Sequence, residues 1–200
     1  MIKIILFDLG EVFFVSNSRK LDESLKAKTG VSIKPKEGKH YQFYIDFVEG
    51  KLTIDEYFDK LRNAANIDIS IDTLRKAYAD SYKETSTIDY GMIELAKKLK
   101  KKYRLICITN TNLLHKNINK ERGLYEVFER VFSSEEAKKL KNESWFSDIL
   151  KELNVKSENC LFIDDLEENT LAARKVGIKS ITFKGREDLI KEMKTYGLEI

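Results

Sequence analysis

Three short apolar runs, each ending in polar side chains, constrain the fold of this chain more than any other feature. They are residues 2–8 (IKIILFD), 103–110 (YRLICITN) and 159–165 (NCLFIDD). Because each run is almost continuously apolar and rich in Ile, Leu, Phe or Cys, it is typical of a strand that is buried on both faces. Such strands belong to parallel sheets with helices on either side.

Other segments complete an alternation of strands and helices. Residues 130–133 (RVFS) and 179–183 (KSITF) are two more candidate strands. Apolar positions three and four residues apart predict helices at about 88–102, 143–153 and 167–176. Strand alternating with helix predicts an α/β fold built on a doubly wound parallel sheet.

The segment 16–86 departs from this alternation, because it has helical patterns and no convincing buried strand. We therefore expect a helical cap subdomain at 16–86, inserted after the first strand. Residues 1–15 and 87–200 would together form the α/β core domain.

Two helix starts can be identified within the expected cap. Thr53, with Glu56 three residues later, forms a capping box that predicts the start of a helix. Ser70 or Asp72 would cap the next helix. The only proline of the chain, Pro35, is expected in the first loop of the cap.

The composition of the chain excludes several classes of protein. Its 200 residues include 36 Lys and Arg and 33 Asp and Glu, for a formal net charge of +3. This near balance favours a soluble protein that binds no nucleic acid. The basic run 97–104 (KKLKKKYR) is interpreted as part of the polar face of a helix, with Leu95 and Leu99 on its inner face.

Two further observations indicate where the protein resides. Cys107 and Cys160 each lie within an apolar run, which fits buried core residues in a reducing compartment better than a disulfide or a metal site. No charged and then apolar leader opens the chain, and no run approaches the roughly 20 apolar residues that span a bilayer. We therefore expect a cytoplasmic protein with no membrane partner.

The polar residues that could carry chemistry follow the three apolar runs. Asp8 ends the first run, Thr109 and Asn110 end the second, and Asp164 and Asp165 end the third. Because parallel α/β sheets bind ligands at the carboxyl ends of their strands, we expect these side chains to meet in one cleft. Three carboxylates together stay ionised only around a cation, and oxygen ligands suit Mg²⁺. Thr109 and Asn110 offer donors that could hold phosphate oxygens.

Each of these residues also fits a simpler role when it is taken alone. Asp164 and Asp165 could be the N-cap pair of the following helix, and Asp8 could be a turn residue. Thr109 and Asn110 could form an ordinary polar turn. The coincidence of all three carboxylates at strand ends favours the metal site.

The same segments resemble motifs of the haloacid dehalogenase (HAD) superfamily, most of whose members are Mg²⁺-dependent phosphatases. The stretch ILFDLGEVFF, which contains Asp8, is similar to the first motif, and ICITNTN (106–112) is similar to the second. The stretch LFIDDLEENTLAARKVGI (161–178) matches the fourth motif closely, including Asn169 and Gly177. The helical segment after the first motif is similar to the small α-helical cap of one subgroup.

The resemblance implies roles for individual residues. Asp8 would be the nucleophile, and Thr109 would bind the phosphoryl group. Asp165 would ligate Mg²⁺ directly, and Asp164 would do so directly or through water. The sequences DLGEV (8–12) and TNTNLLH (109–115), the second of which ends at His115, are similar to those of one branch of the family. This branch includes sugar-phosphate phosphatases such as α-glucose-1-phosphate phosphatase. The implied substrate is a small phosphorylated metabolite, cleaved through an aspartyl phosphate.

The third motif of the family supplies a lysine before the helix that precedes the fourth motif. Lys141 occupies that position in KNESWFSDIL, with Asn142 where the family usually has proline. Lys138 and Lys139 are alternatives in the same segment. A cation here would pair with the nucleophile and neutralise phosphate charge during transfer.

Gly10 departs from the family pattern, because most phosphatases of the family have a second aspartate at this position. That aspartate protonates the leaving group, and its backbone carbonyl ligates the metal. Gly10 keeps the carbonyl and lacks the carboxyl, and losing a general acid–base typically removes about 10²- to 10⁴-fold of rate. Glu11 could substitute through a water. If no group replaces the missing acid, anomeric sugar phosphates and acyl phosphates should be better substrates than alkyl phosphates.

Three functions are compatible with the sequence. The first is a Mg²⁺-dependent phosphatase for small phosphorylated metabolites, and the second is a HAD-fold binding or regulatory protein with little turnover. The third is a haloacid dehalogenase, which needs no metal and would gain nothing from the pair Asp164 and Asp165. The cap would select the substrate, and within residues 40–51 (HYQFYIDFVEGK) Tyr44 and Asp46 are the candidate substrate-binding residues.

Overall fold

Five parallel strands form the centre of the structure, in the order β5-β4-β1-β6-β7. The computed structural model describes residues 1–33 and 40–200, so that Pro35 lies outside the described residues. The strands are β1 (Ile4–Phe7), β4 (Arg104–Thr109), β5 (Arg130–Ser133), β6 (Cys160–Asp164) and β7 (Lys179–Thr182). Together with the helices around the sheet, they confirm the predicted doubly wound α/β fold.

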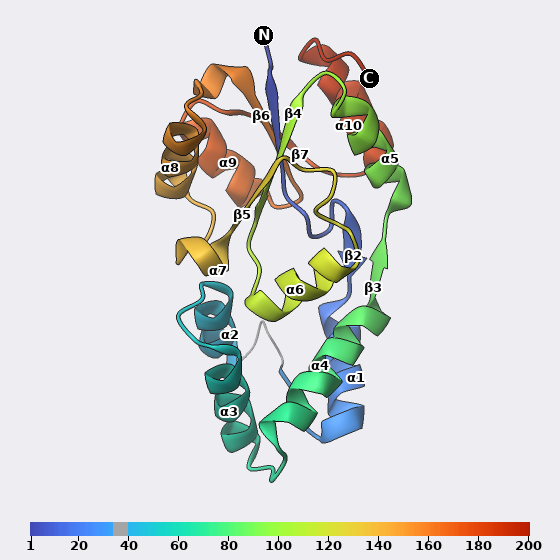
Figure 1. The fold of residues 1–200 in the computed structure, drawn as a ribbon, viewed down its shortest axis with the longest axis vertical. Coiled ribbons are helices and arrows are strands. Elements are labelled where there is room, and N and C mark those ends of the chain that lie inside the picture. The colour runs from blue at the N-terminus through green and yellow to red at the C-terminus, as the bar shows by residue number, and fades with distance from the viewer. Residues whose placement is uncertain (34–39) are drawn as a thin grey trace.

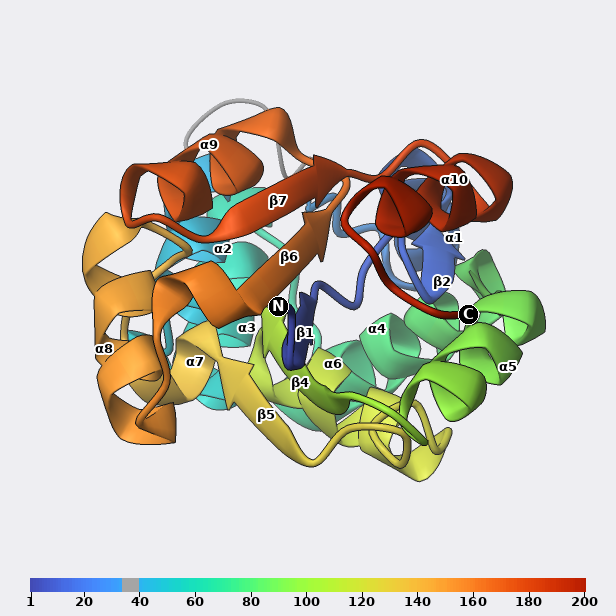
Figure 2. The ribbon, with the colours of Figure 1, turned by 90° about the horizontal axis from the view of Figure 1, so that it is seen from above.

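Helices cover both faces of this sheet (Figure 2). Ile4 and Leu6 belong to the hydrophobic cluster under one pair of helices, and Ile5 and Phe7 belong to the cluster under the other pair. This division follows from the period of two along a strand, which points successive side chains to opposite faces. The first pair is α8 (Glu143–Leu153) and α9 (Glu167–Lys175), and the second is α5 (Tyr90–Leu99) and α10 (Arg186–Thr195).

Four helices lie beyond the carboxyl ends of the strands, where the expected cap should be (Figure 1). A short antiparallel ribbon of β2 (Phe14–Ser16) and β3 (Ser86–Ile88) joins this group to the rest of the chain. The four helices are α1 (Ser18–Thr29), α2 (His40–Val48), α3 (Ile54–Ala65) and α4 (Ile71–Thr85). The remaining short elements are α6 (Leu113–Glu121), α7 (Ser134–Ala137) and the 3₁₀ turn η1 (Ser157–Asn159).

The helix starts in this group follow the expected capping chemistry. Thr53 and Glu56 form the predicted capping box at the start of α3, with the Thr53 hydroxyl 3.2 Å from the Glu56 amide nitrogen. Of the two candidates for α4, Ser70 is the N-cap, because its hydroxyl accepts from the Thr73 amide. Asp72 lies inside the first turn, where its charge favours the helix dipole.

Aromatic side chains form the core of the four-helix group. The rings of Phe47 and Tyr57 stack with their centroids 4.4 Å apart, and Phe58 packs edge to face on Tyr78 at 5.4 Å. All four residues are buried. The packing places α2, α3 and α4 around one apolar centre, as their apolar stripes predict.

One contact closes the seam between α2 and α7. The Ser134 hydroxyl donates to the Val48 carbonyl at 2.7 Å and accepts from the Thr111 amide at 2.9 Å. Next to it, Gly50 comes so close to α7 that an added Cβ would lie 2.3 Å from the Glu135 carbonyl oxygen. Gly50 also has a φ of 64°, a conformation that favours glycine.

The β2–β3 ribbon is absent from the sequence prediction. Each strand has three residues, and only Phe14 in β2 and Ser86 in β3 are buried, so that neither shows a strand pattern. The expected boundaries of the cap fall in this ribbon, one within β2 and one within β3. The division into a core of 1–15 and 87–200 and a cap of 16–86 stays a prediction.

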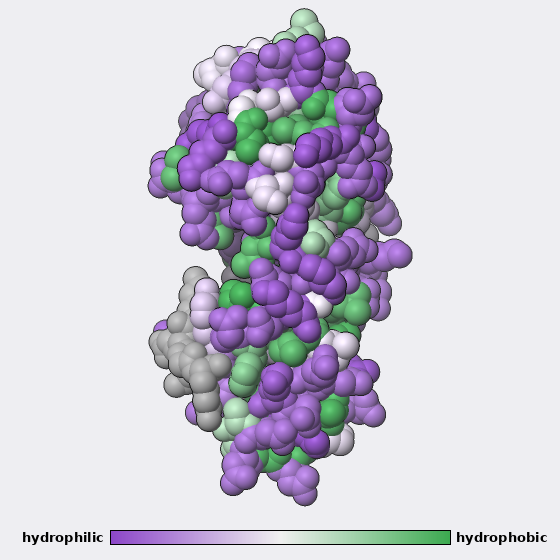
Figure 3. All heavy atoms as spheres, turned by 90° about the vertical axis from the view of Figure 1, so that its left-hand side faces the viewer, coloured by the Kyte–Doolittle hydropathy of each residue, from purple (hydrophilic) through white to green (hydrophobic). Residues whose placement is uncertain are grey.

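Other expectations about surface and core are confirmed. Leu95 and Leu99 are buried on the inner face of α5, and Cys107 and Cys160 are buried free thiols. Hydrophilic side chains cover most of the face shown in Figure 3. Within residues 1–33 and 40–200, no helix is both long enough and apolar enough to cross a membrane.

Phe58→Ala tests the aromatic core. Because Phe58 is fully buried between Tyr57 and Tyr78, its truncation should lower the free energy of unfolding by about 3–5 kcal/mol in urea denaturation. Tyr41→Ala, at a side chain exposed on α2, is the control and should change it by less than about 0.5 kcal/mol. Equal effects of the two variants would contradict this packing.

Candidate active site

Three carboxylates meet at one edge of the sheet. Asp8 follows β1, and Asp164 and Asp165 lie at the end of the neighbouring strand β6. One oxygen from each carboxylate lies within 4.8 Å of the others. Asp8 is 8% exposed and Asp164 is fully buried, whereas Asp165 is half-buried. The arrangement follows from strand order, since β1 and β6 are adjacent and parallel and therefore end side by side.

Lys141 lies between two of these carboxylates. Its Nζ is 2.6 Å from Asp8 Oδ1 and 2.7 Å from Asp164 Oδ2, and its side chain is 1% exposed. The two alternative lysines point elsewhere, because Lys138 donates to the Gly50 carbonyl and Lys139 pairs with Asp148. Of the three candidates, only Lys141 contacts the carboxylate cluster.

Burial governs the electrostatics of this cluster. It raises the pKa of Asp8 to about 7, a rise that Lys141 opposes and Asp164 increases. Burial, together with the Asp164 carboxylate, also raises the pKa of Asp165. Burial disfavours the charged form of Lys141, but Asp8 and Asp164 outweigh it and raise the pKa of its ammonium. One cation therefore faces three acidic groups, which leaves the cluster short of positive charge.

Hydrogen bonds fix the buried carboxylate of Asp164. Its Oδ1 accepts from the Leu166 amide at 2.8 Å and from Asn169 Nδ2 at 3.0 Å. The N-cap position of α9 belongs to Leu166, so the interpretation of Asp164 and Asp165 as an N-cap pair is wrong. Asn169 reaches back from the first turn of α9 and donates to both oxygens of Asp164.

The end of β4 supplies the third side of the cluster. Thr109 is buried, and Asn110 is exposed and accepts from the Lys141 amide through Oδ1 at 3.0 Å. Asn110 thus fixes the backbone that carries the lysine. Both residues line a cavity that begins at Asp8.

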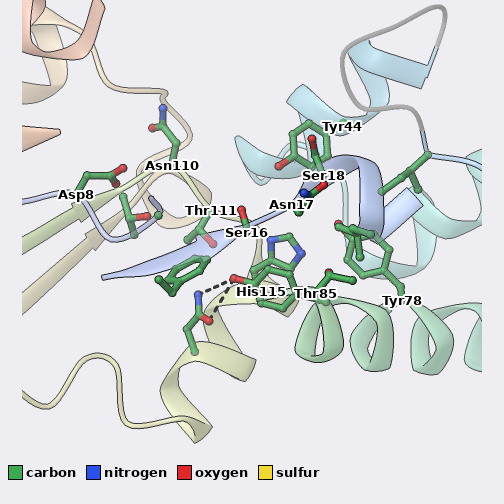
Figure 4. Close-up of a pocket in the computed structure, with 17 residues that line it drawn as sticks. Asp8, Ser16, Asn17, Ser18, Tyr44, Tyr78, Thr85, Asn110, Thr111 and His115 are labelled. Carbon is green, nitrogen blue, oxygen red and sulfur yellow. Dashed lines mark hydrogen bonds between the residues drawn. The ribbon is translucent and has the colours of Figure 1, made fainter. Parts of the chain in front are cut away.

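This cavity has a volume of about 150 Å³ and extends from the carboxyl ends of the strands to the four helices. Figure 4 shows Asp8 and Asn110 at one end and Tyr78 and Thr85 at the other. Tyr44, from α2, lines it as expected. The structure therefore brings the strand-end residues and the expected cap into one enclosure.

Asp46 is not brought to the cavity. Its carboxylate accepts from Gln42 Nε2 at 2.9 Å, along the outside of α2. Residues two positions apart on an α-helix point in nearly opposite directions, so Tyr44 and Asp46 could not both face the cavity. Asp46 therefore does not line the cavity, and its role in substrate binding stays a prediction.

Gly10 lies in the cavity wall and has space beside it. A Cβ added at Gly10 would meet only Phe14 Cζ, at 3.9 Å, and its backbone does not adopt a left-handed conformation. Glu11 points away, because its carboxylate accepts from the amide and the hydroxyl of Ser16, both at 2.8 Å. The backbone of Glu11 is left-handed, with a φ of 54°, which turns its side chain from the cavity.

The sequence analysis missed most of the far wall of the cavity. Ser16 at the end of β2, Asn17 and Ser18 at the start of α1, and Tyr82 and Thr85 from α4 line it. Only Asn17 carries a local signal, as the N-cap that accepts from the Lys20 amide. Which cap side chains face the site depends on how the helices pack.

Comparisons with known proteins agree with this geometry. A family model described as haloacid dehalogenase-like hydrolase matches residues 25–183. The HAD family enzyme bt-2542 from Bacteroides thetaiotaomicron, in complex with magnesium and inorganic phosphate, has a TM-score of 0.81 at 24% identity, covering 92% of this chain and 95% of that one. A predicted HAD-like family hydrolase from Porphyromonas gingivalis has a TM-score of 0.81 at 23% identity over both whole chains.

A more distant structure is a predicted phosphoglycolate phosphatase from Haemophilus somnus. It has a TM-score of 0.58 at 16% identity and covers 90% of this chain and 84% of that one. At these identities the similarity of the solved structures shows a shared fold. No curated protein matches the chain.

Lys141→Met tests the charge balance of the cluster. The variant leaves the Asp8 and Asp164 carboxylates buried without their ammonium partner. In the presence of a chelator, the free energy of unfolding should fall by about 3–5 kcal/mol. Lys139→Met removes a surface pair with Asp148 and should cost no more than about 1 kcal/mol. A Lys141→Met protein as stable as the Lys139→Met protein would contradict this picture.

Proposed function

The chain belongs to the haloacid dehalogenase-like hydrolase family, and we propose that it is a Mg²⁺-dependent phosphatase for small phosphorylated metabolites. The observation that carries the proposal is the cluster of Asp8, Asp164 and Asp165, whose carboxylate oxygens lie within 4.8 Å of one another beside Lys141. A site this short of positive charge suits a divalent cation, which would in turn attract a phosphate group.

The donor set fits Mg²⁺. Asp8, Asp164, Asp165 and the Gly10 carbonyl would hold the ion, and hard oxygen donors are what Mg²⁺ prefers. Bound there, Mg²⁺ would shield phosphate charge from the attacking carboxylate. The magnesium and phosphate named for bt-2542, a protein of the same fold, support this assignment.

The residues of the chain would carry out a double displacement. An oxygen of Asp8 attacks phosphorus, and the bond from phosphorus to the leaving oxygen breaks, with its electron pair staying on that oxygen. Water then attacks the aspartyl phosphate, which restores the Asp8 carboxylate and releases inorganic phosphate. Thr109 and Asn110 would hold the phosphate oxygens, and Lys141 would balance the charge that moves between them.

The missing acid at Gly10 shapes the choice of substrate. Burial lowers the pKa of His115 to about 3 and raises the pKa of the cavity tyrosines Tyr44, Tyr78 and Tyr82, which makes all four poor proton donors near neutral pH. Glu11 is held by Ser16. The leaving oxygen would therefore take its proton from water, which favours acyl phosphates and anomeric sugar phosphates.

A binding or regulatory protein that turns over little is the second candidate function. The observation that favours it is Gly10, since a chain without the general acid–base keeps the fold, the metal ligands and the cavity but loses rate. The dehalogenase function is less well supported, because three clustered carboxylates would serve no purpose without a cation.

Asp165→Ala tests the metal. The loss of this carboxylate should abolish Mg²⁺-dependent hydrolysis of acetyl phosphate, and Mg²⁺ should raise the melting temperature of the unaltered protein but not of the variant. Glu167→Ala, at an exposed acid in the same helix start, is the matched control. The Asp8→Asn protein should be inactive and serves to exclude a contaminating phosphatase. Full activity in excess chelator would overturn the proposal.

Gly10→Asp tests the missing acid. The structure has room for the new side chain, so the variant should fold. It should speed the hydrolysis of primary alkyl phosphates most, by about 10²-fold or more. Acetyl phosphate, whose leaving group needs no proton, should gain little. In Gly10→Asn the new side chain has the shape of aspartate but transfers no proton, so the rate of hydrolysis should not rise. If the unaltered protein already cleaved both classes equally well, another group would be the proton donor.

A further inference from the structure

The imidazole of His115 is held in the wall of the cavity between two tyrosine rings. It stacks on Tyr82 with ring centroids 3.7 Å apart and an angle of 12° between the planes. Tyr78 lies nearly parallel to it, at 5.4 Å and 15°. Figure 4 shows His115 away from the Asp8 end of the cavity, next to Ser16 and Thr85. Stacking of this kind fixes the plane of the ring and the direction of its nitrogens.

One nitrogen of this ring has no partner. His115 Nε2 is enclosed, and no group in residues 1–33 and 40–200 forms a hydrogen bond with it. By contrast, the neighbouring Tyr82 hydroxyl is paired with the Asn119 side chain at 3.2 and 3.1 Å. Buried polar atoms are almost always hydrogen-bonded, so this unpaired nitrogen marks a part of the cavity wall whose hydrogen bonding is incomplete.

The chemistry of the surrounding wall indicates the kind of ligand. Hydroxyl and amide groups of Ser16, Asn17, Thr85 and Asn119 line the cavity near His115. In the part of the chain that the structure describes, Asp8 is the only lining residue with a charged side chain, and burial keeps His115 neutral. The lining described within residues 1–33 and 40–200 offers no cation to a second anionic group on a ligand, which would be desolvated there, whereas hydroxyl groups would find donors and acceptors.

We propose that the imidazole of His115, after a small shift that uncovers Nε2, hydrogen-bonds a hydroxyl of the substrate's leaving group, and that the cavity selects small, uncharged, hydroxyl-bearing leaving groups over carboxylated ones. This inference rests on the proposed phosphatase function, with the phosphate at the Asp8 end. The volume of about 150 Å³ is below the roughly 300–1,000 Å³ of sites for drug-sized ligands, which limits the leaving group to a small one. Phosphoglycolate, whose leaving group carries a carboxylate, is thereby disfavoured.

Glycerol 3-phosphate and 3-phosphoglycerate test the selection, because they differ only in a terminal CH₂OH or carboxylate. Both are titrated calorimetrically, in the presence of Mg²⁺, into the Asp8→Asn protein. The substitution prevents turnover of either compound. Glycerol 3-phosphate should bind about tenfold or more tightly than 3-phosphoglycerate. Binding that is equal, or tighter for 3-phosphoglycerate, would overturn the inference, as would no binding of glycerol 3-phosphate.

Variants of His115 in the same background test the role of its nitrogen. His115→Phe keeps a flat ring between Tyr78 and Tyr82 but has no ring nitrogen. It should weaken the binding of glycerol 3-phosphate about 3- to 10-fold relative to the binding of inorganic phosphate. His115→Gln offers an amide at a similar reach and should recover part of the loss. Asn117, which is exposed on the same helix, provides the control: Asn117→Ala should leave the affinity for both ligands unchanged.

The outcomes separate the two proposals. Acetyl phosphate turnover by the unaltered protein reports on phosphatase chemistry alone, so its absence would overturn the proposed function whatever the binding results. If the unaltered protein is active but His115→Phe leaves the affinity for glycerol 3-phosphate relative to phosphate unchanged, the role of His115 is overturned while the proposed function stands. Thermal melts of each variant verify that it is folded.

Discussion

The ammonium of Lys141, held between Asp8 and Asp164, is the interaction on which the rest of the site depends. Two carboxylates at the ends of adjacent buried strands would repel each other in a region with little water. Lys141 offsets this repulsion with contacts of 2.6 and 2.7 Å, and Asn110 holds its backbone from the end of a third strand. The strand order β4-β1-β6 thus brings the ends of three strands to one cation.

The parts of this arrangement that follow from local pattern could be predicted. Continuous apolar runs identify buried parallel strands, and parallel strands bring their ends together, so the meeting of Asp8, Thr109 and Asp164 follows from sequence. The capping box of Thr53 and Glu56 is likewise a local feature. These predictions succeed because each depends on neighbours in the chain or on a rule of sheet geometry.

The parts that depend on packing between distant segments could not be predicted. Three lysines, Lys138, Lys139 and Lys141, follow one another closely, and only the path of the chain after α7 decides which is buried. The β2–β3 ribbon buries too few side chains to leave a pattern. Tyr44 faces the cavity and Asp46 does not, because the rotation of α2 is set by contacts with other helices.

The Ser134 hydroxyl couples the position of α2 to that of the loop after β4. It bonds the Val48 carbonyl of α2 and the Thr111 amide, which lies in the loop after Thr109 and Asn110. If α2 swings away from α7 to admit a ligand, this bond to Val48 breaks and the support of the loop loosens. The position of α2 and the fixation of the loop that follows Thr109 and Asn110 therefore depend on the same hydroxyl.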